Sequence, residues 1–132
     1  EPSRRQRQMC IRDRGYMATV PDEKINTGDA TIGPLLTYNV SLSDVGTHYV
    51  WIRMSGPSGG GDSLHVGLNG IPKTFGGVGL STSPNGQWNW ELIVVNNTST
   101  GLNQLNIWMR EDGVRIDSII MTHMEDFSPI IQ

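Results

Sequence analysis

Short runs in which apolar and polar residues alternate follow one another along most of the chain. Alternation with period two is typical of a strand that buries one face, and aromatic and β-branched residues strengthen that interpretation. The clearest run begins at His48 and continues through Tyr-Val-Trp-Ile-Arg-Met. The pattern predicts main strands at 38–42, 48–54, 62–69, 88–95, 104–110 and 114–122, and candidate early strands at 16–20 and 31–36.

Turn-forming residues separate these runs. Asn69-Gly70 is a strong signal for a two-residue hairpin turn, because both residue types accept a positive φ. Residues 71–86 contain several proline and Gly-Gly breaks with little periodicity, and we expect a long loop there. Short strands separated by turns, with no segment patterned as a long helix, favour an all-β sandwich or barrel.

The last two predicted strands are expected to form a hairpin around Glu111-Asp112-Gly113. In the first of them, Leu105 and Met109 alternate with Asn106, Trp108 and Arg110. The apolar set is expected to face the core. Trp108 is then expected on the wet face, which is an unusual place for a large aromatic ring.

The chain has 132 residues, of which 36% are hydrophobic, and this size suits one domain with a single core. The first 15 residues, EPSRRQRQMCIRDRG, carry five arginines but have neither strand nor helix periodicity. They resemble translated adapter sequence at the end of a metagenomic gene model, and they lack the apolar stretch of a signal peptide. We therefore interpret 1–15 as a foreign or disordered head and 16–132 as the domain.

Composition excludes several classes of function. The net charge is −3 although the head is basic, so the body is acidic and unsuited to binding nucleic acid. No apolar run of about 18 residues is present to insert into a membrane as a helix. The single cysteine cannot form an internal disulfide.

The sequence offers no candidate catalytic residues either. His48, His65 and His123 have no metal-ligand spacing, and His48 and His123 are most simply surface residues. The chain has no nucleophile elbow, and Glu111 and Asp112 are adjacent rather than facing each other across a cleft. We expect no enzymatic activity.

Sugar binding fits the residues better. A sugar ring presents an apolar face of C–H groups and a rim of hydroxyls, so a site needs an exposed aromatic platform beside hydrogen-bonding side chains. Candidates near predicted strand ends are Trp88, Trp90, Arg110, Glu111, Asp112 and Arg115. Structural roles stay open for several of them: Trp90 as a core residue, Arg110 and Glu111 as a surface ion pair, and Asp112 as a turn residue.

Six segments carry motifs in a recognisable order, among them Gly-Gln-Trp-Asn-Trp at 86–90 and Gly-Val-Arg-Ile-Asp-Ser-Ile at 113–119. The other four lie at 36–40, 45–53, 62–70 and 101–107. This order resembles carbohydrate-binding modules of families six and thirty-five, which are galactose-binding-like β-sandwiches, over roughly residues 16–124. The resemblance implies two antiparallel sheets with jelly-roll connections and non-catalytic binding of a polysaccharide.

The resemblance also implies site residues. It places the stacking aromatic at Trp88, and the ligand-contacting asparagine of "G-x-N-I-D" is replaced here by Arg115. Arginine suits carboxylate or sulfate better than a neutral hydroxyl, so an acidic polysaccharide is our hypothesis. Those families often hold calcium. The region 16–23 lacks their Glu-x-Glu pair, so calcium stays open, with Asp117 and Asp22 as candidate ligands.

The leading hypothesis is therefore a bacterial carbohydrate-binding sandwich, secreted or attached to the cell surface, and part of a larger protein or assembly. The rival hypothesis is a structural or adhesive module, or a self-assembling subunit, with the same fold and no sugar site. Low charge, many small polar residues and exposed strand edges would suit that role.

Overall fold

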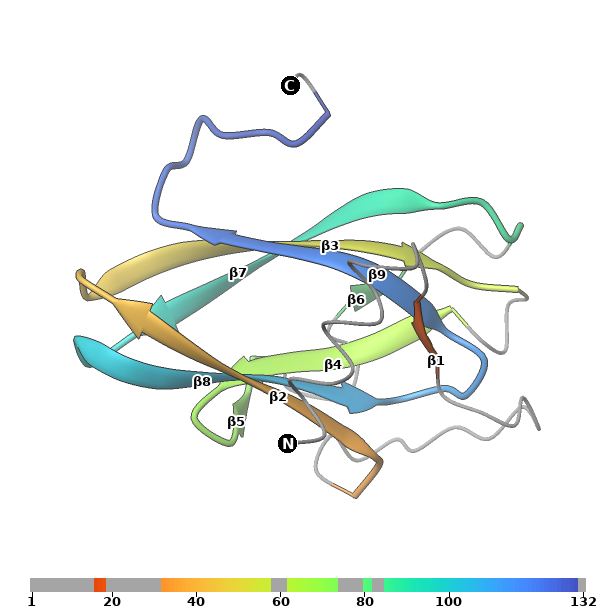
Figure 1. Cartoon of the computed structure of the whole chain (residues 1–132), viewed down its shortest axis with the longest axis horizontal. Coiled ribbons are helices and arrows are strands. Elements are labelled where there is room, and N and C mark those ends of the chain that lie inside the picture. Colours follow the sequence, from red (N-terminus) through yellow and green to blue (C-terminus); the bar gives the residue numbers. More distant parts are fainter. Residues whose placement is uncertain (1–15, 19–31, 58–61, 74–79, 82–84, 131–132) are drawn as a thin grey trace.

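The computed structural model describes residues 16–18, 32–57, 62–73, 80–81 and 85–130, which form two antiparallel sheets packed face to face (Figure 1). The β3 sheet has the strand order β1–β9–β3–β7 and the β8 sheet has the order β2–β8–β4–β5, with β6 paired to β4. The β3 sheet contains β1 (Met17–Ala18), β3 (Gly46–Ser55), β7 (Asn89–Asn97) and β9 (Arg115–Thr122). The β8 sheet contains β2 (Leu35–Leu42), β4 (Ser63–Leu68), β5 (Ile71–Pro72), β6 (Leu80–Ser81) and β8 (Gly101–Met109).

The all-β sandwich predicted from the alternation is thereby confirmed. Most consecutive strands lie in opposite sheets, as expected of jelly-roll connections. The described residues contain no helix, and so they include no helical membrane span. The predicted head at 1–15 lies outside the described residues.

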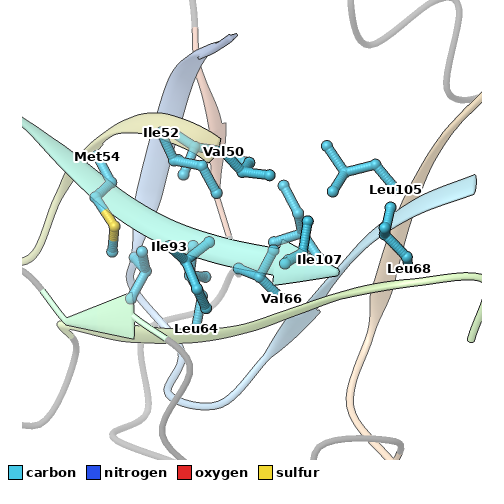
Figure 2. Packing of buried hydrophobic residues seen from close by; sticks show 12 residues of the cluster. Val50, Ile52, Met54, Leu64, Val66, Leu68, Ile93, Leu105 and Ile107 are labelled. Atoms are coloured by element: carbon cyan, nitrogen blue, oxygen red, sulfur yellow. The ribbon is translucent and has the colours of Figure 1, made fainter. Parts of the chain in front are cut away.

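Strict alternation along β3 places the core on one side of the β3 sheet. Val50, Ile52 and Met54 are fully buried, whereas Trp51 and Arg53 between them are half-buried on the opposite, outer face. The buried side chains of β3 meet those of β4 and β8 across the interior (Figure 2). The core consists of Val50, Ile52, Met54, Leu64, Val66, Leu68, Ile93, Val95, Leu105, Ile107, Val114 and Ile116.

One extra residue interrupts the pairing of β9 with β3. Arg53 pairs with Ser118, but Met54 pairs with Ile116, so Asp117 is left over as a β-bulge. In a regular strand, Ile116 and Ile119 would face opposite sides of the sheet, because they are three residues apart. The bulge brings both to the core side, with Ile116 opposite Met54. Arg115 and Asp117 are therefore turned to the outer side, where Arg53 lies.

The turn at Asn69-Gly70 is confirmed, since the two residues have φ of 52° and 81°. The loop expected at 71–86 is partly wrong, because it contains β5 and β6, which both pair with β4. Gly67 permits the close return of β5. A Cβ atom at Gly67 would lie 2.0 Å from the carbonyl oxygen of Ile71.

Three further expectations are wrong. The last two long strands do not form a hairpin, because β8 and β9 belong to different sheets and the connection around 110–114 crosses between them. Trp108 is buried rather than wet, since β8 is a central strand on which Leu35 and His65 flank it from both sides. His48 is buried too, because it lies on the core-facing side of β3 opposite Val95.

The core assignment makes a direct prediction about stability. Leu105 is 1% exposed, so Leu105→Ala should lower the free energy of unfolding by about 2–5 kcal/mol through lost burial and the cavity that it leaves. Leu102, on the same strand, is 75% exposed, and Leu102→Ala should change stability by no more than about 0.5 kcal/mol. Urea denaturation of both variants measures the difference, and equal losses would contradict this placement of the core.

Candidate functional site

A tight loop fixed to the end of β3 presents Trp88. Gly86 has a φ of 76°, which favours glycine, and its N–H donates to the carbonyl oxygen of Gly56 at 2.8 Å. The hydroxyl of Ser55 donates to the carbonyl oxygen of Gly86, also at 2.8 Å. These two bonds hold the chain just before Trp88, which is half-buried where the loop meets β7.

Side chains from four distant parts of the sequence meet around the Trp88 ring, and we call Tyr16, Arg53, Trp88 and Arg115 the Trp88 cluster. The guanidinium carbons of Arg53 and Arg115 lie 5.2 Å and 5.4 Å from the centre of the indole ring. The rings of Tyr16 and Trp88 are 5.8 Å apart and tilted by 54°. Arg115 also lies 5.5 Å from the centre of the Tyr16 ring, so cations and aromatic rings alternate through the cluster.

The two guanidinium groups of the cluster differ in their partners. Arg53 forms an ion pair with Asp117, the bulged residue of β9. Arg115 donates to the neutral hydroxyl of Ser55 at 2.8 Å, and among the described residues it has no carboxylate partner. Its Nε atom is buried without a hydrogen-bond partner in that part of the chain. The positive charge of Arg115 is therefore not neutralised by a described side chain.

This arrangement can bind a ligand that has both an apolar face and an acidic group. An indole ring packs against apolar C–H groups, and a guanidinium group binds a carboxylate through two parallel hydrogen bonds. Ser55 orients Arg115, and Asp117 orients Arg53.

Two of the predicted site residues, Arg110 and Glu111, form a different group at the start of β4. Glu111 accepts hydrogen bonds from Ser63 at 2.6 Å and from Arg110 at 2.5 Å, and Arg110 also donates to Ser63 at 2.8 Å. Glu111 and Asp112 are only 4% and 3% exposed. The structure thus places Arg110 and Glu111 in a network that attaches the crossing between the sheets to β4, and Asp112 follows as a buried residue of that crossing. No interaction of these residues with the Trp88 cluster is among those described.

Asp62 lies beside this network. Its backbone N–H donates to Glu111 at 3.3 Å. Burial raises the pKa of the Asp62 carboxyl, and the charge and hydrogen bond of Glu111 raise it further.

The other predicted residues are placed as follows. Trp90 is half-buried on β7, opposite Arg53 in the strand register, and lies on the outer side of the β3 sheet with Trp88. Asp117 faces Arg53, and Asp22 lies outside the described residues. One oxygen of Asp117 is buried without a partner, but the described residues form no group of three or more potential metal ligands.

Sequence reasoning missed Tyr16, Arg53 and Ser55 as site residues. Arg53 had a signal, since it ends the alternation of β3 on the same face as Trp51 and would therefore be presented outward. Tyr16 and Ser55 had none, because their roles depend on the pairing of β1 and β3 with β9.

Comparison with known proteins identifies the fold. No protein-family model matches the chain. Among curated proteins, an uncharacterised protein P23 of Formosa agariphila is 24% identical over 87% of this chain, which spans about a third (34%) of that protein.

Solved structures are similar over most of the chain. A family 35 carbohydrate-binding module from an environmental isolate has a TM-score of 0.56 at 19% identity, covering 81% of this chain and 83% of that module. A family 35 module from Clostridium thermocellum has a TM-score of 0.57 at 16% identity, covering 81% and 87%. A family GH115 4-O-methyl-α-glucuronidase matches at a TM-score of 0.53 and 20% identity, over 76% of this chain and 14% of the enzyme. The chain therefore has the fold of a carbohydrate-binding module.

The Asp62 and Glu111 pair predicts a dependence of stability on pH. Because the pKa of Asp62 is raised in the folded state, ionised Asp62 destabilises the fold, and the wild type regains that stability as the pH falls through the folded-state pKa. Asp62→Asn, which can donate to Glu111 at any pH, should be more stable than the wild type at neutral pH.

This advantage should shrink toward about pH 4, where Asp62 becomes protonated. Thermal unfolding of both proteins across this range measures it. Asp126→Asn, at an exposed position, serves as a control for the loss of one carboxylate. An advantage that grows on acidification would contradict the raised pKa of Asp62.

Proposed function

We propose that this chain binds polysaccharide without chemical turnover, and that the Trp88 cluster is its binding site. The observation that carries the proposal is a half-buried indole ring with two guanidinium groups within 5.4 Å of its centre, one of them lacking a described carboxylate partner. The likeness of the fold to carbohydrate-binding modules supports the same role. The sugar would pack its C–H face on Trp88 and direct its polar groups toward the arginines.

The preferred ligand in this proposal is an acidic polysaccharide. Arg115, which has no carboxylate partner in the part of the chain that the structure describes, would offer its guanidinium group to a carboxylate or sulfate of the ligand. Asp117, the acidic residue beside the cluster, would oppose such a ligand only weakly, because it is paired with Arg53, and Glu111 belongs to the separate group with Arg110. A uronic acid residue of the polysaccharide satisfies both the aromatic and the cationic part of the cluster.

We further propose that the chain acts as an accessory module of a larger bacterial protein that is secreted or attached to the cell surface. The matched part of the Formosa agariphila relative is about a third of its length, and the matched part of the glucuronidase is 14% of its length. Attachment to a polysaccharide would concentrate the rest of the protein on that substrate.

The proposal includes a test of whether polysaccharide binding depends on calcium. Asp117 keeps one carboxylate oxygen without a described partner, and Asp22 is the other candidate ligand. A calcium ion there would supply positive charge beside the Arg53 side of the cluster. The binding measurements below are therefore made with added calcium and again with a chelator.

Removal of the aromatic platform should abolish binding. We expect Trp88→Ala to lose retention on a panel of glucuronoxylan, polygalacturonate, mannan and cellulose, because the sugar loses its packing surface. Affinity electrophoresis measures the retention. Trp88→Phe, which keeps a smaller aromatic ring, should retain part of it. The melting temperature of each variant should stay within a few degrees of the wild type, and unchanged retention of a folded Trp88→Ala protein would remove Trp88 from the site.

Removal of the Arg115 guanidinium group should change which polysaccharides bind. We expect Arg115→Gln to bind polygalacturonate or glucuronoxylan about tenfold or more weakly, because a charge-assisted hydrogen bond is lost, while binding to neutral mannan changes little. Isothermal titration at low and high salt measures both effects. Lys73→Gln removes one exposed positive charge elsewhere and is the matched control. Equal losses for acidic and neutral polymers would contradict a preference for acidic ligands.

A further inference from the structure

The outer face of the β3 sheet carries an apolar surface next to the Trp88 cluster. Tyr49, Trp51 and Arg53 alternate along β3 on this face, and Trp90, Leu92 and Val94 alternate along β7. In the register, Arg53 lies opposite Trp90, Trp51 opposite Leu92, and Tyr49 opposite Val94. On the other side of β3, Trp51 pairs with Ile120 and Tyr49 pairs with Thr122 of β9. We call Tyr49, Trp51, Trp90, Leu92, Val94 and Ile120 the outer apolar row.

This surface is accessible along the edge strand. Leu92 is 40% exposed and Val94 is 36% exposed, and the three aromatic residues of the row are half-buried. An exposed apolar patch bordered by polar residues marks a binding surface in many soluble proteins. The chain leaves β9 at Thr122, and the segment 123–130 continues on the outer side of the sheet (Figure 1). The part of the row that lies next to the Trp88 cluster consists of Trp90, Trp51 and Leu92.

The row is continuous with the Trp88 cluster through Arg53. The guanidinium group of Arg53 lies 5.2 Å from the centre of the Trp88 ring, and the backbone of Arg53 pairs directly with Trp90. From Arg53, the next outward residues along β3 are Trp51 and Tyr49. Since a strand rises about 3.3 Å per residue, they follow at steps of about 7 Å. An extended ligand held at Trp88 would therefore meet further aromatic rings along one straight line.

Charge also changes along this line. At the end of the row next to the Trp88 cluster, the outward position of β3 is the charged residue Arg53. The six residues of the row itself include no Lys, Asp or Glu. Hydroxyl side chains lie at its border, at Ser118 and Thr122 of β9. The cluster end suits an acidic sugar residue, and the row suits neutral sugar residues that present C–H faces and hydroxyl groups.

We propose that the outer apolar row is a second contact surface for polysaccharide, which binds the neutral sugar residues of a chain whose acidic residue lies at the Trp88 cluster. This inference rests on the proposed function and deepens it, because it assigns the ligand as an extended chain rather than a single sugar. We favour a sugar chain over a protein partner because the row continues directly from the Trp88 cluster through Arg53.

Two variants and one matched control test the row. Leu92→Glu and Leu102→Glu both place a carboxylate on an exposed strand position, but on opposite sheets. Trp51→Ala removes the central ring of the row. Each is compared with the wild type on glucuronoxylan as the polymer and on free glucuronic acid, by isothermal titration and by NMR titration respectively, with thermal unfolding as the check on folding.

The row predicts that polymer and monosaccharide binding separate. Leu92→Glu and Trp51→Ala should weaken binding to glucuronoxylan about three- to tenfold and leave binding to glucuronic acid unchanged. Leu102→Glu should change neither. If Trp51→Ala does not fold, Leu92→Glu decides the question, because its side chain is exposed.

Three outcomes would overturn the inference. Unchanged polymer binding by Leu92→Glu, or an equal loss for polymer and monosaccharide, would remove the row and leave the proposed function standing. A wild-type dimer that Leu92→Glu dissociates in gel filtration would show that the row is a protein interface. Failure of the wild type to bind either probe, or any polymer of the panel, would remove the proposed function together with the row.

Discussion

A single extra residue in β9 decides on which side of the β3 sheet the cationic side chains lie. Without the bulge at Asp117, Arg115 would have the same parity as Ile119 and would point into the core, where an unpaired guanidinium group would be strongly destabilising. With the bulge, Ile116 and Ile119 both pack inward, and Arg115 turns outward beside Ser55. The candidate site depends on this local change of register.

The same bulge supplies the counter-ion of the site. Asp117 has no partner in the strand register, and its carboxylate reaches Arg53 across the sheet. Arg53 is thereby paired with a carboxylate and held 5.2 Å from the centre of the Trp88 ring. Among the described residues, Arg115 has a hydroxyl partner, Ser55, but no carboxylate partner.

Much of the architecture could be predicted from the sequence, because alternation reports burial directly. The long strands and the turn at Asn69-Gly70 follow from residue types alone. Of the predicted site, the structure brings Trp88 and Arg115 together. The remaining predicted residues depend on information that a local pattern does not carry. Glu111 was expected on the rim of a hairpin, but it is buried because the connection crosses to the other sheet.

The side of the sheet on which a side chain lies, and whether that side is buried, was the hardest property to predict. Trp108 and His48 were both placed in solvent, and both are buried, because neighbouring strands and the opposite sheet decide what covers a given face. The bulge at Asp117 is invisible in the pattern for a similar reason. The sequence of this segment is compatible with a regular strand, and only the register with β3 reveals the extra residue.

The Trp88 cluster joins residues that lie at positions 16, 53, 88 and 115 of the chain. No short fragment of the sequence contains all four, and β sandwiches with such distant pairings fold slowly. A ligand that requires the whole cluster binds only the fully assembled sandwich and stabilises it by mass action against every partly opened form. Occupancy of the cluster would thus protect the sandwich from local opening and proteolysis for as long as a ligand stays bound.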